Sequence, residues 1–297
     1  MKGHTTPLAA HRPLPVERVV WACYAGNAQH TAVSMFAPSG YTNIAWSTAL
    51  DANPPVNGND LSIHYGSAAL TGITIVIPYK LQSGHFEFDG RLISTGHLNW
   101  SYTSTYNLPP GGWNWIPPVS GTLLPNGSYV GPVYGGGIFV RPHVDSATQT
   151  PSVYYPCGNT EFNNYSSQYA QNVFISTPIT ADISGNVYYG VRTYGAVHNG
   201  MTSGFVKMDT SGNATMYTCA ANHWPALNAA PAVSNDGKTI YAVEAVNGSI
   251  ESHMIALNAS TMAKTADALL IDPSSGYDAY AEPDGTSCPL VGPDGDV

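Results

Sequence analysis

The chain has 297 residues, which is long enough to bury a substantial hydrophobic core. Only 10 Lys and Arg stand against 19 Asp and Glu, and the net charge of −9 excludes the basic patch that nucleic-acid binding requires. The sequence contains no apolar run of about 18 residues, so a membrane-spanning helix is excluded.

The composition indicates an all-β protein. Charged residues make up 10% of the chain, whereas Gly (30), Pro (23) and Tyr (19) are abundant. Short apolar runs rich in Val, Ile, Tyr and Thr alternate with Gly, Pro and Asn-Gly or Asp-Gly, which is typical of strands and tight turns. The low charge also favours a secreted or periplasmic protein, although residues 1–18 lack the apolar region of a signal peptide.

The first predicted unit lies within residues 19–46. Residues 19–24, 32–36 and 44–46 match the second, third and fourth strands of a four-stranded sheet. No first strand precedes them. We therefore interpret residues 1–18 as an N-terminal extension and residues 19–297 as a single domain.

Five later segments repeat one pattern along the chain. Each has a short strand, a tight turn that contains Gly, and a second apolar strand, as in the segments around Gly185, Gly237 and Gly295. The units start at residues 66, 121, 178, 231 and 289, so the steps between them are 55, 57, 53 and 58. Such a period indicates a repeat architecture.

The remaining strands of each unit complete a sheet. Residues 205–212 and 254–260 are predicted third strands, and residues 98–100 end an early fourth strand. Four antiparallel strands repeated around an axis predict a β-propeller. The C-terminus supplies a first strand that the N-terminal unit lacks, so we expect about five blades with both termini in one sheet; a fragment of a larger ring is the alternative.

The units resemble the quinoprotein-like, or PQQ-like repeat, propellers, most clearly at residues 254–258 and 286–297. This resemblance implies a propeller fold. Enzymes of that family use an adjacent Cys pair over the cofactor and an acidic calcium site, whereas the four cysteines here lie at positions 23, 157, 219 and 288. We therefore expect no PQQ and no other cofactor, and calcium or another divalent cation stays an alternative.

Two cysteines offer a test of ring closure. In the aligned hairpins, Cys23 and Cys288 lie about equally far from the turn, which predicts cross-strand neighbours that could form a disulfide. Two buried free thiols are the alternative.

Chemistry is expected on the face where the loops between blades gather, because those loops are long and carry acids and aromatics. The candidate catalytic residues are Asp60, His64, Glu161, His223, Asp278 and Glu282. The candidate ligand-binding residues are Trp113, Trp115, Tyr165, Trp224 and Tyr277.

Aromatic faces beside polar groups suit a small polar molecule or a carbohydrate. The leading hypothesis is therefore an extracytoplasmic propeller that binds such a ligand. A cation-dependent hydrolase of the lactonase or glycosidase type and a scaffold that binds a protein partner are the alternatives. The sequence leaves open whether the protein is an enzyme.

Overall fold

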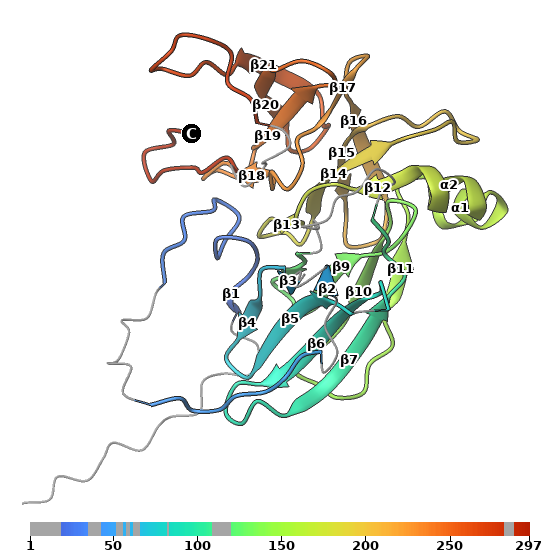
Figure 1. Cartoon of the computed structure of the whole chain (residues 1–297), viewed down its shortest axis with the longest axis vertical. Coiled ribbons are helices and arrows are strands. Elements are labelled where there is room, and N and C mark those ends of the chain that lie inside the picture. Colours follow the sequence, from blue (N-terminus) through green and yellow to red (C-terminus); the bar gives the residue numbers. More distant parts are fainter. Residues whose placement is uncertain are drawn as a thin grey trace, which may run out of the picture.

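The protein is a β-propeller of four-stranded antiparallel blades, as predicted. In the computed structural model the described residues are 19–34, 43–51, 56–57, 60–61, 66–81, 83–108, 120–281 and 288–297. Four sheets follow one another in chain order along an arc (Figure 1). Within the described residues, no helix is long and apolar enough to cross a membrane.

The first two blades have simple up-and-down order. Blade 1 contains β4 (Ala69–Thr71), β5 (Thr74–Lys80), β6 (Phe86–Leu92) and β7 (Leu98–Ser104). Blade 2 contains β8 (Thr122–Leu123), β9 (Tyr129–Pro132), β10 (Ile138–Arg141) and β11 (Ser152–Tyr154). A separate two-stranded sheet is formed by β2 (Val56–Asn57) and β3 (Asp60–Leu61).

In the third and fourth blades the inner strand is split into two pieces that pair with one long neighbour. Blade 3 contains β12 (Val173–Ile175), β13 (Thr180–Ala181), β14 (Val187–Thr193), β15 (Gly204–Met208) and β16 (Ala214–Thr218). Blade 4 contains β17 (His223–Pro225), β18 (Ala232–Val233), β19 (Thr239–Val246), β20 (Ser252–Asn258) and β21 (Lys264–Leu269).

The inner strands follow the predicted repeat. Strands β4, β8, β13 and β18 begin at residues 69, 122, 180 and 232, close to the predicted unit starts at 66, 121, 178 and 231. The turn glycines Gly127, Gly185, Gly237 and Gly295 all have φ between 71° and 92°. Only glycine adopts this left-handed backbone without strain, which explains the regular Gly spacing.

The predicted composite blade is wrong in its pairing. Strand β1 (Val19–Trp21) pairs with β4 in blade 1, and residues 288–297 form no strand. A tight turn follows β1 directly, because the Gly26 N–H donates to Cys23 O and Ala25 and Gly26 have φ of 51° and 91°. The chain therefore leaves the sheet before residue 24.

Residues 22–30 instead run across the inner strands of several blades. The Ala22 carbonyl accepts from the Leu123 N–H of blade 2, and the Ala28 carbonyl accepts from the Val233 N–H of blade 4. The buried His30 ring lies 3.2 Å from Thr180 Oγ1 of blade 3 and 2.8 Å from Pro289 O. This axial segment ties the blades and the C-terminal residues together.

The disulfide prediction is also corrected, because Cys23 and Cys288 are free thiols in the structure. Once β1 pairs with β4, the two cysteines are no longer cross-strand neighbours. The Cys23 thiol donates to Asn27 O, and the Cys288 thiol donates to Asn228 O.

Two further predicted segments differ. Residues 44–46 form no strand, and the Trp46 ring packs against the turn at Gly96 while its Nε1–H donates to Ile93 O. The loops between blades are expected to be long, but residues 142–176 contain β11, β12 and two short helices, α1 (Asn159–Asn164) and α2 (Ser166–Asn172).

Candidate functional site

The loops that follow the second and fourth strand of each blade emerge on one side, because neighbouring strands are antiparallel. We call this side the loop face. In blades 3 and 4 it includes residues 194–203 after β14, residues 219–222 after β16 and residues 247–251 after β19.

An open cleft of about 730 Å³ lies on the loop face between blades 3 and 4. We call it the interblade cleft. Its aromatic members are Tyr194 and Trp224, and His223 lines it beside them. Asn222, Asn247, Thr193, Thr202 and Ser203 also line it. Among the described residues that line the cleft there is no Asp, Glu, Lys or Arg.

Trp224 is held in place from blade 3. The Arg192 guanidinium lies 4.4 Å from the centre of the Trp224 ring, and it donates two hydrogen bonds to Pro225 O. The Tyr194 ring centre lies 6.3 Å from that of Trp224. A buried cation stacked on an indole orients the ring, so this wall of the cleft is preformed.

The floor beneath His223 is set by sheet register. Glu244 pairs with His253, and His223 pairs with Val246, two residues along β19 from Glu244. Residues opposite each other in a sheet share a face, so His223, Glu244 and His253 lie on one face of blade 4. Ile240, Ala242, Ile255 and Leu257 continue that face into the apolar core that blades 3 and 4 share.

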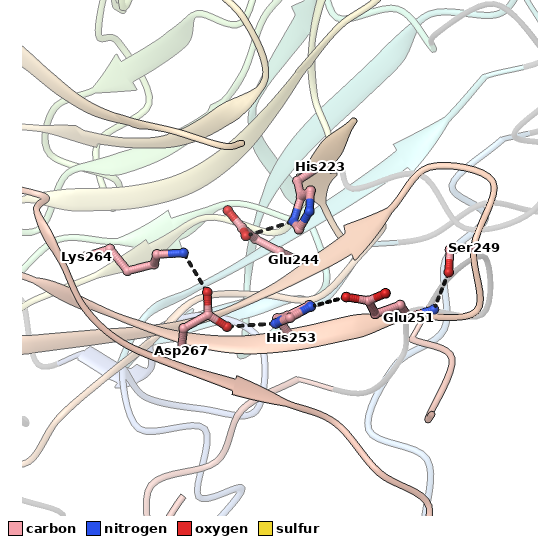
Figure 2. A network of polar contacts seen from close by, with 7 residues as sticks. All are labelled: His223, Glu244, Ser249, Glu251, His253, Lys264 and Asp267. Atoms are coloured by element: carbon pink, nitrogen blue, oxygen red, sulfur yellow. Dashed lines mark hydrogen bonds and ion pairs between the residues drawn. The ribbon is translucent and has the colours of Figure 1, made fainter. Parts of the chain in front are cut away.

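Glu244 is the buried charge of this group. Its residue is 1% exposed, its Oε2 lies 3.4 Å from His223 Nδ1, and its Oε1 has no hydrogen-bond partner among the described residues (Figure 2). A buried carboxylate is costly unless cationic or donor groups compensate it. The His223 ring is the group that faces this carboxylate from the cleft side.

His253 is held by two carboxylates. Its Nδ1 lies 2.7 Å from Asp267 Oδ1 and its Nε2 lies 2.8 Å from Glu251 Oε1 (Figure 2). Burial lowers the pKa of His253, but the hydrogen bonds to Glu251 and Asp267 outweigh it and raise the pKa above its ordinary value. Both ring nitrogens of His253 are thus engaged by carboxylates, which favour its protonated form.

Cys219 lines the interblade cleft but is not set up as a nucleophile. Burial and the charge of Glu244 raise the pKa of its thiol, so the thiolate is disfavoured. Reactive cysteines need the opposite setting, with a lowered pKa next to positive charge.

A second group of predicted residues meets beside α1 and α2. Glu161 Oε1 lies 2.9 Å from His198 Nδ1 and accepts from the Tyr169 hydroxyl at 2.8 Å. Tyr165 stacks on His198 with ring centres 3.6 Å apart. Burial raises the pKa of Glu161, but the hydrogen bonds from Tyr169 and His198 bring it below its ordinary value. These contacts fix the 194–203 loop, which forms one wall of the interblade cleft.

Among the described residues, two more of the predicted site residues, Tyr277 and Asp278, join neither group. Tyr277 is 74% exposed, and Asp278 forms an isolated bridge with Ile271 in the loop after β21. Asp60 lies in β3 and its side chain is outside the described part of the structure. His64, Trp113, Trp115 and Glu282 lie outside the described residues.

Of the residues that line the cleft or lie beneath it, the sequence predicted His223 and Trp224. It did not predict Glu244, Tyr194, Asn222 and Asn247. Glu244 had a visible signal, because it is the only charged residue in the apolar strand β19. Charged residues in buried strands are rare unless they are paired.

The four cysteines are free and lie far apart in the sequence, so the adjacent Cys pair of quinoprotein enzymes is missing here, and the absence of PQQ stays a prediction. Within the part of the chain that the structure describes, no three His, Cys, Asp or Glu side chains gather as a metal site. The calcium alternative therefore finds no ligand cluster among these residues.

No protein-family model matches the sequence, and no curated protein matches it. Among solved structures, a europium-containing methanol dehydrogenase is similar over 90% of this chain and 52% of its own, with 12% identity and a TM-score of 0.56. The luciferin-regenerating enzyme gives 15% identity over 71% of this chain and 61% of its own, with a TM-score of 0.42.

A quinonprotein alcohol dehydrogenase-like protein from Bacteroides thetaiotaomicron gives 8% identity over 74% of this chain and 68% of its own, with a TM-score of 0.25. The present chain thus spans about half the length of the methanol dehydrogenase. At such low identity the likeness extends to the fold and not to a particular family. The chain is therefore similar in fold to the methanol dehydrogenase.

Proposed function

We propose that this propeller binds a neutral polar ligand with an apolar face, of the carbohydrate type, in the interblade cleft. The observation that carries the proposal is the pairing of Trp224 and Tyr194 with uncharged hydrogen-bonding groups in a cleft of about 730 Å³. Ligand sites commonly have this size and this mixture of aromatic and polar groups.

The charge of the cleft narrows the class of ligand. Phosphates and other strongly ionic ligands are usually bound by Arg, Lys or a metal. Neither Arg nor Lys lines the described cleft. Side-chain amides and hydroxyls can bond a neutral ligand's hydroxyl and carbonyl groups. An extracytoplasmic location stays a prediction from composition, and it agrees with a carbohydrate ligand.

A glycan array followed by calorimetric titration of the best binder tests the proposal. Trp224→Ala removes the stacking face and is expected to weaken binding about tenfold. Tyr277→Ala is the matched control, because it removes another exposed loop-face aromatic that lies outside the cleft lining. Binding that is unchanged in Trp224→Ala, or equally weakened in both variants, contradicts the proposal. A silent array contradicts it too and favours the protein scaffold.

A further inference from the structure

We propose that the interblade cleft is an active site in which His223 is the general base that activates water to hydrolyse a neutral ester, with Glu244 as its positioning residue. This inference rests on the proposed function, because the ester would occupy the same cleft as the ligand. It adds a reaction to that binding site.

The buried pair under the cleft is the first observation. Glu244 Oε2 approaches only Nδ1 of His223, so the Nδ1 nitrogen carries the proton and the lone pair of the neutral ring lies on Nε2. The His223 side chain is 22% exposed and lines the cleft, whereas the Glu244 side chain is 1% exposed. The carboxylate thus fixes the tautomer from below and leaves Nε2 as the ring nitrogen available to a bound molecule.

The unpartnered Oε1 of Glu244 is the second observation. It is buried and accepts no hydrogen bond from the described residues. A purely structural His–Glu pair is most stable when both carboxylate oxygens accept hydrogen bonds. Both oxygens of Asp182 and of Asp209 do so in their turns. The Tyr217 hydroxyl and the Cys219 thiol are further hydrogen-bonding neighbours of Glu244, and its buried negative charge stabilises an imidazolium that forms during a reaction.

Two other titratable side chains near the cleft, His253 and Cys219, are unsuited to act as the base, which leaves His223. Both ring nitrogens of His253 face carboxylates, and the thiol of Cys219 is held protonated by its surroundings. The charged and titratable groups packed around the His223–Glu244 pair are Arg192 on β14, Tyr217 on β16, Cys219 after β16, His253 on β20 with Glu251 and Asp267, and Lys264 on β21.

The reaction needs only water and the ester. His223 Nε2 takes a proton from water as the water oxygen forms a bond to the ester carbonyl carbon, and the carbonyl electron pair moves onto its oxygen. Collapse of this tetrahedral species re-forms the carbonyl and breaks the bond to the alkoxy oxygen, which receives the proton from Nε2. The products are one carboxylic acid and one alcohol, and His223 returns to its neutral form.

The cleft lining selects the ester over a glycoside. Glycosidic hydrolysis uses two carboxylic groups flanking the bond, and none of the described cleft residues is Asp or Glu. An ester needs a base and hydrogen-bond donors for its carbonyl oxygen. The side-chain amides of Asn222 and Asn247 line the same cleft and can donate to that oxygen.

The test measures hydrolysis of 4-nitrophenyl acetate and 4-nitrophenyl butyrate by the full chain and by single variants. His223→Gln is expected to lower kcat/KM about 100-fold or more, which is the usual contribution of a general base. His97→Gln is the matched control, because His97 is an exposed histidine in the turn before β7 of blade 1 and does not line the cleft. It is expected to keep the activity within about twofold of the unmodified chain.

Glu244→Gln separates positioning from mere support of the fold. Removing the negative charge is expected to lower kcat with little change in KM, and to shift the pH–rate profile toward lower pH because the imidazolium loses its partner. Glu244→Asp, which restores the charge, is expected to recover part of the rate. A pH profile that is the same in Glu244→Gln and the unmodified chain contradicts the positioning role.

Failure of the reaction is distinguishable from failure of binding. Equal rates for His223→Gln and the unmodified chain, or no hydrolysis of either ester by the unmodified chain, overturn the general-base proposal. The array and calorimetry of the previous section use no turnover, so they still decide whether the cleft binds its ligand.

Discussion

The interface between blades 1 and 2 and that between blades 3 and 4 are built on the same strand plan but are filled differently. Between blades 1 and 2, Phe88 and Phe139 lie edge to face at 5.0 Å, and Tyr102 approaches Phe139 at 4.2 Å. Tyr129 also packs against both phenylalanines. Aromatic rings thus occupy the space between these sheets.

Among the described residues between blades 3 and 4, only blade 3 supplies aromatic rings to the shared core, namely Tyr188 and Phe205. On the blade 4 side Ile240, Ala242, Ile255 and Leu257 form an aliphatic surface, and toward the loop face that surface changes to Glu244 and His253. The cleft lies above that change. The difference indicates that a propeller can make a site simply by ending its apolar packing early at one interface and placing polar residues at the register positions that remain.

The largest expected effect on stability comes from removing an aromatic side chain from the interface between blades 1 and 2. Phe139 is fully buried, so Phe139→Ala is expected to lower the free energy of unfolding by about 3–5 kcal/mol. Urea denaturation measures this value. The folded fraction should still bind the ligand of the cleft with unchanged affinity, whereas Trp224→Ala should weaken binding and cost less stability. A loss of less than about 1 kcal/mol in Phe139→Ala would mean that the aromatic packing is not what holds blades 1 and 2 together.

A somewhat smaller effect is expected at the axial segment that both interfaces share. Burial lowers the pKa of His30 from 6.5 to about 4, and the hydrogen bond to Pro289 O offsets only part of this. Between pH 4 and 6.5 the unfolded chain therefore binds more protons at this residue than the folded chain does. The free energy of unfolding should rise with pH across that window, by at most about 3 kcal/mol, and this contribution is constant above it.

His30→Gln removes the titrating group and isolates its contribution. The change in stability between pH 4.5 and 7, measured by urea denaturation, should be smaller in this variant than in the unmodified chain. The same pH dependence in both chains would show that His30 does not titrate as a buried neutral side chain.

Much of the fold could be predicted from the sequence because the glycines that mark its turns depend only on the local backbone conformation. A tight turn with positive φ requires glycine whatever surrounds it, so Gly127, Gly185 and Gly237 marked three inner hairpins without any tertiary information. The pairing of β1 could not be predicted in this way. Its three residues would suit either sheet edge, and the turn at Ala25 and Gly26 decides the outcome by redirecting the chain.

The site was predicted only in part, for a physical reason. His223 and Trp224 could be predicted because they lie in one of the loops between blades, where acids and aromatics gather. Their partners come from other strands and other blades: Glu244 from the middle of β19, Tyr194 from the loop after β14 and Arg192 from β14 itself. Only the sheet register and the packing of blade 3 on blade 4 bring these residues together, and neither is readable from spacing along the chain.

The most direct test of the central claim, that the interblade cleft is the functional site, is a crystal structure of the protein with the glycan selected on the array. The account predicts the sugar ring stacked on Trp224, with hydrogen bonds to Asn222 or Asn247 and with a ligand oxygen within reach of His223 Nε2. A glycan bound instead at the loop around Tyr277 and Asp278, with the interblade cleft empty, would contradict it.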